Sequence, residues 1–451
     1  MQRDRLSSRL GFLMLSAGCA IGVGNVWKFP WLTGQNGGGV FVLVYLLFLV
    51  LLGLPVMTME FSMGRAAQKS PVHMYQELEP KGSKWHYHGY IALVGNIMLM
   101  MFYSVVSGWM LYYLVSSANG SLTGLSVGDV GKFFGQMLSS ASIVSFYTVV
   151  TVIAAFIILA FPIRTGLEKV SKWMMGTLFV LMVFLALHSL FLDGAREGLS
   201  FYLLPDFSKV TSGTVVGAMN QAFFSLSIGM GSMAIFASYI DKEQSLVKES
   251  ISVIALDTTV ALLAGLIIFP ACFTYGVKAT AGPSLIFEAL PQIFNEMTFG
   301  RVWGSLFFLF MTFATFSTVL AVCEAILSCV RDLTHWARPK ASFVCCTGLV
   351  ILSLPCALGF NVLSDIQPFG AGSSILDLED FIVSNVILPL GALCFAIFCT
   401  RKCGWGWKNY MTEVNTGKGL KMPNIMRFYC TWILPLIILS VFAVGIAPFF
   451  K

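Results

Sequence analysis

Long stretches without a charged side chain recur along the whole chain. Because about 20 apolar residues of α-helix cross the hydrocarbon core of a bilayer, each such run predicts one membrane-spanning helix. The end of the third run, residues 119–124, is rich in Gly and Ser and is typical of a loop. Eleven runs of 18 or more residues lack Asp, Glu, Lys and Arg: 10–27, 29–59, 85–128, 133–163, 173–192, 210–240, 258–277, 302–323, 341–364, 381–400 and 428–450. The pattern predicts an all-α integral membrane protein with eleven transmembrane helices.

Composition agrees with this prediction. Of 451 residues, 57% are hydrophobic and only 11% are charged, and the mean hydropathy is +0.81. A soluble protein carries charge on about a quarter of its residues. The longest polar stretch, about 401–427, only joins two expected spans, so residues 1–451 are expected to form a single membrane domain.

The charged residues are distributed unevenly over the expected loops. Alternate loops hold 21 Lys and Arg on one side and 6 on the other, and Lys28 lies inside a span, which accounts for all 28. The positive-inside rule then predicts a cytoplasmic N-terminus and an external C-terminus in the plasma (inner) membrane. The basic residues form no patch, so we expect the lipid bilayer and no nucleic acid as a partner.

Two of the expected spans contain helix-weakening segments. Gly22, Val23 and Gly24 interrupt the first span, and residues 227–232 interrupt the sixth. Lipid cannot satisfy the backbone groups that such a break releases. The breaks lie five spans apart, so the second has inverted topology, which indicates an inverted-repeat transporter with discontinuous helices one and six. The repeats are expected at about 9–192 and 210–400, with an extra helix at about 428–450. Glycines that only pack helices are the alternative, but they give no reason for Asn25 and Ser225 beside the breaks.

The polar residues near the breaks suit ions and a zwitterion. Exposed N–H groups at the start of a half-helix suit a carboxylate, and exposed carbonyl groups suit a cation. Oxygen ligands for a hard cation such as sodium are available from Asn25, Ser225, Asp257, Ser317 and Thr318. An aspartate in a span costs about 2.5–3.5 kcal/mol on insertion scales, which favours a cation ligand over a structural carboxylate. Asp257 lies at the start of the run 258–277, so its depth stays open.

Several motifs carry a family resemblance. They are Gly-Val-Gly-Asn-Val-Trp-Lys-Phe-Pro at 22–30, Gln-Asn-Gly-Gly-Gly at 35–39, the segment 55–65 with Glu60 and Gly64, Asp-Phe at 206–207 and Phe-Phe-Ser-Leu-Ser at 223–227. With them the chain resembles bacterial members of the neurotransmitter:sodium symporter family, of the hydrophobic amino acid transporter type, over almost its whole length. The resemblance implies a LeuT-like 5+5 inverted-repeat fold.

The resemblance also implies two sodium sites. The first would use the substrate carboxylate and Ala20, Asn25, Ser225 and Asp257. The second would use backbone oxygens of Gly18, Ile21 and Ala314 with the hydroxyls of Ser317 and Thr318. Animal relatives need chloride near the first site, and Asp257 supplies fixed negative charge there. Chloride is therefore not expected as a cofactor.

The same resemblance implies the substrate class. Amine-transporting relatives carry an aspartate where this chain has Gly22, so the substrate here must bring its own carboxylate, to the amides of Val23 and Gly24 and the Tyr103 hydroxyl. Its amino group would donate to backbone oxygens of Phe224 and Ser227. The side chain would face a mostly apolar lining, which implies a neutral, hydrophobic or aromatic L-amino acid: Leu99, Val106, Phe224, Met230, Ser317 and Val322.

Gates and supporting carboxylates follow from the family pattern. Lys28 and Asp380 are expected as the outer charged gate, and Arg3 and Asp332 as the inner one. Glu324 is expected to face the break in helix one. Glu60 is expected to satisfy backbone groups near the break.

Together these features predict a sodium-driven symporter that imports amino acids by alternating access. Two alternatives stay open: the same fold with another small zwitterion such as taurine, glycine or GABA, or a sensor that binds an amino acid without moving it. An enzyme is not expected, because no nucleophile–base pair or metal cluster stands out. A monomer or a weak oligomer is expected.

Overall fold

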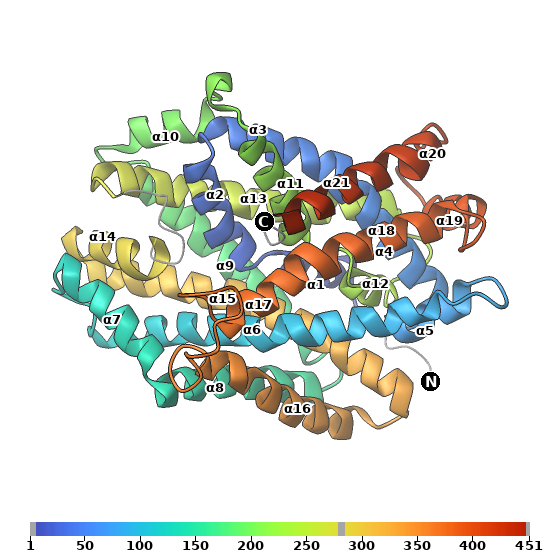
Figure 1. Cartoon of the computed structure of the whole chain (residues 1–451), viewed down its shortest axis with the longest axis horizontal. Coiled ribbons are helices and arrows are strands. Elements are labelled where there is room, and N and C mark those ends of the chain that lie inside the picture. The colour runs from blue at the N-terminus through green and yellow to red at the C-terminus, as the bar shows by residue number, and fades with distance from the viewer. Residues whose placement is uncertain (1–5, 278–284, 448–451) are drawn as a thin grey trace.

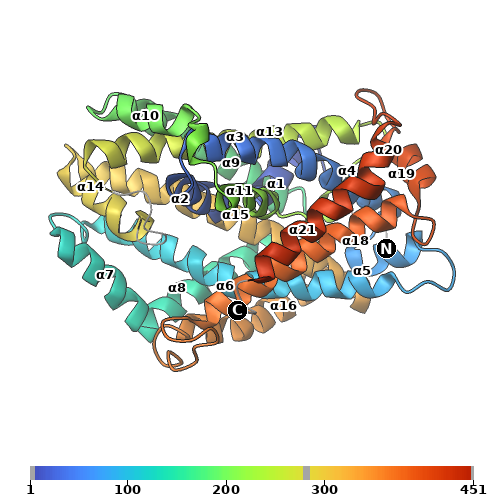
Figure 2. The same cartoon turned by 45° about the horizontal axis from the view of Figure 1, so that its top comes forward.

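The structure, a computed structural model, describes residues 6–277 and 285–447. These residues form a bundle of long helices whose axes run in broadly similar directions (Figure 1). Short helices cap the two ends of the bundle. α7 (Val127–Ser139), α10 (Ala195–Leu203) and α14 (Leu290–Glu296) lie at one end, and α5 (Pro71–Leu78) and α19 (Trp407–Val414) lie at the other, as both ribbon views show (Figures 1 and 2).

Most of the expected spans are present as single helical stretches. Within the described residues, nine stretches are long and apolar enough to cross a membrane: Gly39–Ala67, His86–Asn119, Ala141–Ala160, Leu167–Ser189, Leu246–Thr274, Gly300–Thr334, Arg338–Leu358, Ile375–Thr400 and Met426–Ile446. A tenth is a bent pair, Arg9–Ala20 with Gly24–Gln35, at an angle of 56°. The run 210–240 forms α11 (Ser212–Leu226) and α12 (Ser232–Ala237), each shorter than a span. The all-α membrane class is confirmed, and the count of eleven stays a prediction.

The boundary between the first two spans was placed wrongly. The first span continues through Lys28, as α1 (Arg9–Ala20), η1 (Gly24–Lys28) and α2 (Phe29–Gln35). The chain then turns at Gly37 and Gly38, which have φ of 89° and 70°. The second span follows as α3 (Gly39–Phe48), η2 (Leu49–Gly53) and α4 (Leu54–Ala67). A single lysine ends a charge-free run without ending a helix, whereas left-handed glycines do end one.

The seventh expected span also begins earlier than its charge-free run. α13 spans Leu246–Thr274, with Lys248 and Glu249 in its first turn. Asp257 therefore lies in the middle of a membrane helix and is fully buried. The run 133–163 is corrected in a similar way, because it divides at Ser140 into α7 and α8 (Ala141–Ala160). The loop expected at 119–124 is confirmed, since α6 (His86–Asn119) ends there.

The broken helices lie against the two longest helices of the fold. α1 packs on α9 (Leu167–Ser189), α13 and α15 (Gly300–Thr334), and α15 packs along α6. The remaining elements are η3 (Phe207–Lys209), η4 (Leu285–Ala289), α16 (Arg338–Leu358), α17 (Ile375–Phe381), η5 (Ile382–Ile387), α18 (Leu388–Thr400), α20 (Met426–Phe428), η6 (Tyr429–Ile433) and α21 (Leu434–Ile446).

Candidate substrate and sodium site

The first break lies where three helices approach the backbone of the first span. α1 ends at Ala20, Ile21 is extended with φ −71° and ψ 109°, and η1 begins at Gly24. A Cβ atom on Gly22 would lie 2.1 Å from the Tyr103 hydroxyl oxygen and 2.7 Å from Thr318 Oγ1. The lack of a side chain at Gly22 therefore lets α6 and α15 reach the unwound backbone.

The second break is satisfied by side chains from neighbouring helices. Ser227, Gly229 and Gly231 have left-handed φ of 50°, 108° and 73° between α11 and α12. The Gly229 amide donates to Glu60 of α4. Asn96 of α6 donates to the Met230 carbonyl at 3.0 Å and accepts from the Ser232 hydroxyl at 2.6 Å.

Glu60 therefore has the kind of role that was expected, although it serves the break in helix six. Asn96 was missed by the sequence analysis. Its signal was a lone asparagine in an otherwise apolar stretch of the run 85–128, a type of residue that membrane interiors admit only where it finds partners.

The two breaks meet in the centre of the protein. The Ser227 hydroxyl donates to the Cys19 carbonyl at 3.3 Å, and Gln221 Nε2 donates to the Gly24 carbonyl at 2.7 Å. The Val23 amide donates to the Tyr103 hydroxyl at 2.9 Å. The structure thus brings together the predicted carboxylate-binding groups of the first span and α6.

The five residues predicted for the second sodium site also come together. Thr318 Oγ1 lies 3.3 Å from the Gly18 carbonyl oxygen, 3.0 Å from that of Ile21 and 3.5 Å from that of Ala314. The Ser317 hydroxyl donates to the Ala314 carbonyl at 2.9 Å. A hydroxyl has one proton to donate, so it cannot satisfy three carbonyls at once. A buried set made only of oxygens suits a hard cation such as Na⁺.

The residues predicted for the first sodium site surround a buried carboxylate. Asn25 Nδ2 donates to Asp257 Oδ1 at 2.7 Å and to the Asp257 carbonyl at 3.2 Å, while Asn25 Oδ1 accepts from the Gly22 amide at 3.3 Å. Within the described part of the chain, the buried Asp257 Oδ2 has no hydrogen-bond partner. A buried charge is costly unless it is paired, so this oxygen fits a cation ligand. Ala20, the fourth predicted residue, ends α1 beside them and is buried.

Ser225 is connected to a residue that the sequence analysis missed. Its hydroxyl lies 3.1 Å from the Tyr45 hydroxyl, and both side chains are buried. Tyr45 comes from α3, and it is the one hydroxyl-bearing side chain in the charge-free stretch between Gly39 and Thr58. That isolated phenol was the available signal.

The residues predicted to face the substrate side chain come from three places around the breaks. Leu99 and Val106 are on α6, Met230 is in the second break, and Val322 is on α15; all four are at most 5% exposed. Phe224 and Ser227 are half-buried. Their contact with a substrate stays a prediction.

The predicted outer gate is assembled, with its two charges at the limit of an ion pair. Lys28 Nζ lies 4.0 Å from Asp380 Oδ2 and 3.9 Å from the centroid of the Phe224 ring. Asp380 Oδ1 accepts from the Ser384 hydroxyl at 2.6 Å. Of the predicted inner gate, Asp332 accepts from the Ser70 amide at 2.8 Å, while Arg3 lies outside the described residues.

Replacement of Lys28 by arginine is expected to slow substrate dissociation by up to about fivefold. A guanidinium can hold Asp380 with two parallel hydrogen bonds where an ammonium acts as a point charge, and a pair this exposed contributes about 0.2–1 kcal/mol. Dissociation of a labelled substrate from the purified protein measures the effect. The variant Asp380→Asn should show faster dissociation, and equal rates in all three proteins would contradict a gating role.

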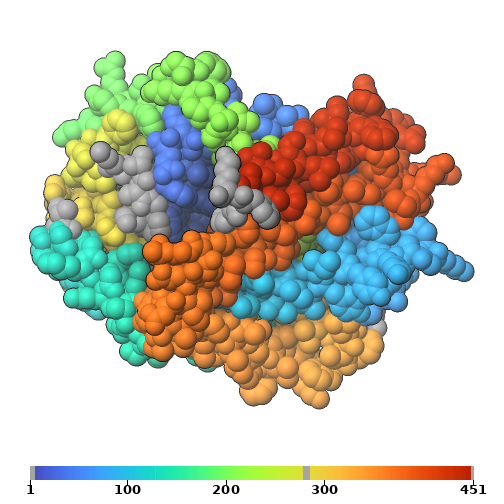
Figure 3. All heavy atoms as spheres, in the orientation of Figure 1, coloured from blue at the N-terminus to red at the C-terminus, as the bar shows by residue number. Residues whose placement is uncertain are grey.

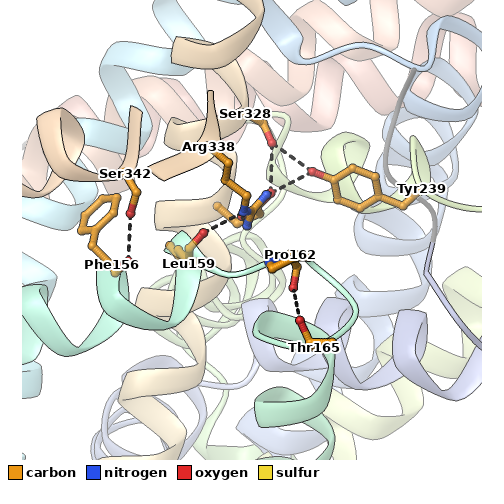
Figure 4. A network of polar contacts seen from close by, with 9 residues as sticks. Phe156, Leu159, Pro162, Thr165, Tyr239, Ser328, Arg338 and Ser342 are labelled. Atoms are coloured by element: carbon orange, nitrogen blue, oxygen red, sulfur yellow. Dashed lines mark hydrogen bonds and ion pairs between the residues drawn. The ribbon is translucent and has the colours of Figure 1, made fainter. Parts of the chain in front are cut away.

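Glu324 does not face the break in helix one, so that expectation was wrong. Its carboxylate pairs with Arg338 of α16, at 2.5 Å for Nη2 and 3.1 Å for Nη1. Tyr239 and Ser328 donate to it at 3.0 Å and 3.2 Å in the same network (Figure 4). Arg338 Nε also donates to the Leu159 carbonyl of α8 at 2.7 Å. A buried arginine must be neutralised where it lies, and this need places Glu324 between α8, α15 and α16.

Two further carboxylates hold the beginning of α1. Ser7 donates to Glu168 of α9 through its amide at 2.8 Å and its hydroxyl at 2.5 Å. Arg9 pairs with the buried Glu249 of α13 at 2.7 Å. The inner half of the first span is therefore tied to two neighbouring helices on the side away from the Lys28–Asp380 gate.

Comparison with known proteins assigns the family. Residues 3–129 and 127–451 match the sodium:neurotransmitter symporter family. The chain is 35% identical over 451 residues to an uncharacterized sodium-dependent transporter, YhdH, of Bacillus subtilis, with 98% of each chain covered. It is 33% identical to an uncharacterized sodium-dependent transporter of Haemophilus influenzae, again with 98% of each covered.

A solved structure is similar over the same length. The crystal structure of MhsT in complex with L-phenylalanine matches with a TM-score of 0.89 and 35% identity, covering 98% of this chain and 100% of that one. The shared fold confirms the predicted inverted-repeat architecture with broken helices one and six. The chain is a sodium-coupled membrane transporter that belongs to the sodium:neurotransmitter symporter family.

Proposed function

We propose that the protein imports neutral hydrophobic or aromatic L-amino acids together with sodium, by alternating access. The observation that carries the proposal is the oxygen set around Thr318, where three carbonyl oxygens lie within 3.5 Å of one hydroxyl. This set adjoins the side-chain-free position Gly22, whose nearest neighbours are Thr318 and Tyr103. Sodium would bind the oxygens, and the substrate would bind next to Gly22.

An α-amino acid fits the groups beside the sodium sites. Val23 and Gly24 offer backbone amides at the start of a half-helix, which suit a carboxylate, and glycine at position 22 leaves the amine without a side-chain counter-ion. The predicted lining of Leu99, Val106, Met230 and Val322 is apolar. The similarity to MhsT in complex with L-phenylalanine supports the same class. An apolar pocket discriminates by about 1–3 kcal/mol per methylene, so several related side chains would be accepted.

Coupling would arise because the substrate completes the first sodium site. Its carboxylate would share a cation with Asn25, Ser225 and Asp257, together with the carbonyl of Ala20. Sodium would then tighten substrate binding, and substrate would tighten sodium binding by the same factor. Closure of Lys28 on Asp380 would follow on the outside, and release of α1 from Glu168 and Glu249 would open the inside.

Chloride is not part of the proposed cycle. Asp257 is fully buried and carries the fixed charge that would otherwise be supplied by an anion. The proposed orientation has the N-terminus in the cytoplasm and the C-terminus outside, as the excess of Lys and Arg on one side indicates. A monomer or a weak oligomer would suffice, because the proposed site lies within one chain.

The decisive experiment is uptake into proteoliposomes. Labelled phenylalanine, leucine, glycine, GABA and taurine are offered with sodium, potassium or choline outside, and chloride is replaced by gluconate in a parallel series. We expect sodium-dependent accumulation of the first two in both series. Preference for glycine, GABA or taurine would support the small-zwitterion alternative. Sodium-dependent binding without accumulation would support the sensor alternative, and a strict chloride requirement would contradict the proposed role of Asp257.

A further inference from the structure

An open pocket lies at the ends of two membrane helices, far from the broken segments. It has a volume of about 880 Å³ and is formed where α18 ends at Thr400 and where the chain enters α20 and η6. In both ribbon views these elements lie together at the end of the bundle that holds α19 (Figures 1 and 2). The pocket therefore lies at the level where a membrane meets water.

The pocket is positively charged. Arg401, Lys402 and Arg427 line it, and its lining contains no Asp or Glu. The segment 401–427 holds six Lys and Arg and a single acid, Glu413. That acid is engaged elsewhere, because its Oε1 lies 2.6 Å from Nε of the fully buried Arg65. Among residues 6–277 and 285–447, no carboxylate comes within ion-pair distance of the three pocket cations.

Arg401 is held in place with most of its donors unused. Its Nη2 donates to the Thr431 carbonyl at 3.2 Å, and its guanidinium lies 3.9 Å from the centre of the Trp432 ring. The neighbouring Cys403 carbonyl accepts from the Trp85 indole at 2.7 Å, which ties the turn after α18 to α6. A guanidinium has five N–H donors, so this one can still bind an oxyanion. The Thr431 hydroxyl, which also lines the pocket, has no hydrogen-bond partner in the described part of the chain.

Apolar side chains surround these charges on the outside. Ile425 is 84% exposed, Phe428 67% and Trp432 52%, and all three line the pocket. Above them, α21 is the span with the smallest buried share, 22% of its apolar window. The space-filling view shows this part of the chain, in red and orange, on the molecular surface (Figure 3). Exposed aromatic residues next to Arg and Lys are typical of the lipid–water interface.

We propose that this pocket binds the head group of an anionic phospholipid, with its acyl chains along α21. The phosphate would accept from Arg401, Arg427 and Lys402, since arginine binds phosphate oxygens with two parallel hydrogen bonds. Basic pockets between membrane helices on the cytoplasmic side have the chemistry for such lipids. The proposal depends on neither the substrate nor the sodium sites.

The test uses the full-length protein in neutral detergent and titrates phosphatidylglycerol against phosphatidylcholine, with bound lipid counted by native mass spectrometry. The double variant Arg401→Gln/Arg427→Gln should bind phosphatidylglycerol at least about tenfold more weakly than the unaltered protein. The matched control, Lys408→Gln/Lys418→Gln, removes two charges from the same segment outside the pocket and should stay within twofold. Equal losses in both variants would mean a diffuse charge effect and would overturn the proposal.

A second readout needs no variant. Cys403 lines the pocket and is exposed, whereas the other ten cysteines are buried or half-buried. Phosphatidylglycerol should slow its reaction with a polar maleimide, and phosphatidylcholine should not. An unchanged rate would overturn the proposal. Equal protection by glycerol phosphate or inorganic phosphate would do so as well, because the site would then recognise a free phosphate.

Discussion

Sodium-dependent substrate binding is expected to fall by about 30- to 4,000-fold when Asp257 is replaced by asparagine. Asparagine keeps the shape and can still accept from Asn25, which now donates to Oδ1 at 2.7 Å. It removes the charge that Oδ2 offers to a cation. Loss of one member of a buried charged pair costs about 2–5 kcal/mol, which gives the quoted range.

Equilibrium binding of a labelled amino acid, titrated with sodium at fixed substrate, measures this effect. The matched control is Asp129→Asn, which removes the same charge from an exposed ion pair with Lys132 on α7. It should leave the sodium titration unchanged. Full sodium-dependent binding in Asp257→Asn would show that this carboxylate is structural and would remove the first sodium site as proposed.

Uptake is expected to fall by at least about 70-fold when Gly22 is replaced by alanine. The added methyl would lie 2.1 Å from the Tyr103 hydroxyl and 2.7 Å from Thr318 Oγ1, so both side chains must move. Overpacking and the loss of a hydrogen bond to the substrate carboxylate together cost at least about 2.5 kcal/mol, which sets the estimate. The cause is steric, because Gly22 is not among the glycines with a left-handed φ.

Gly348→Ala is the matched control for this substitution. It adds the same methyl group in the membrane helix α16, where no other atom lies within 4 Å. Uptake and thermal stability in detergent should match those of the unaltered protein. If Gly22→Ala transports as well as Gly348→Ala does, the close approach of Tyr103 and Thr318 is not needed for the site.

The positions of the two breaks could be predicted because their cause is local. Glycines in an apolar run weaken the helix wherever the chain lies, and the structure interrupts the spans at Ile21–Val23 and at 227–231. The residues of the second sodium site were also anticipated, by motif resemblance. Their convergence on Thr318 could not come from spacing alone, since Gly18 and Ala314 are almost 300 residues apart.

Other features depended on partners that a linear pattern does not contain. Glu324 pairs with Arg338 rather than with the first span, and Glu60 serves the break in helix six. Asn96 and Tyr45 became recognisable only through the groups that they bond. In each case a buried polar group takes the nearest available partner, and that partner lies on another helix.

The sequence by itself determined that the chain is a membrane protein, where its helices break and which residues can supply oxygens. These properties depend on the hydrophobicity and backbone preference of each segment, which are local. Tertiary structure alone decided the depth of Asp257, the packing of Tyr103 and Thr318 against Gly22, and the partners of the buried carboxylates. Those depend on distances between helices remote in the chain, because charges and backbone groups inside a bilayer must be satisfied by whichever helix lies beside them.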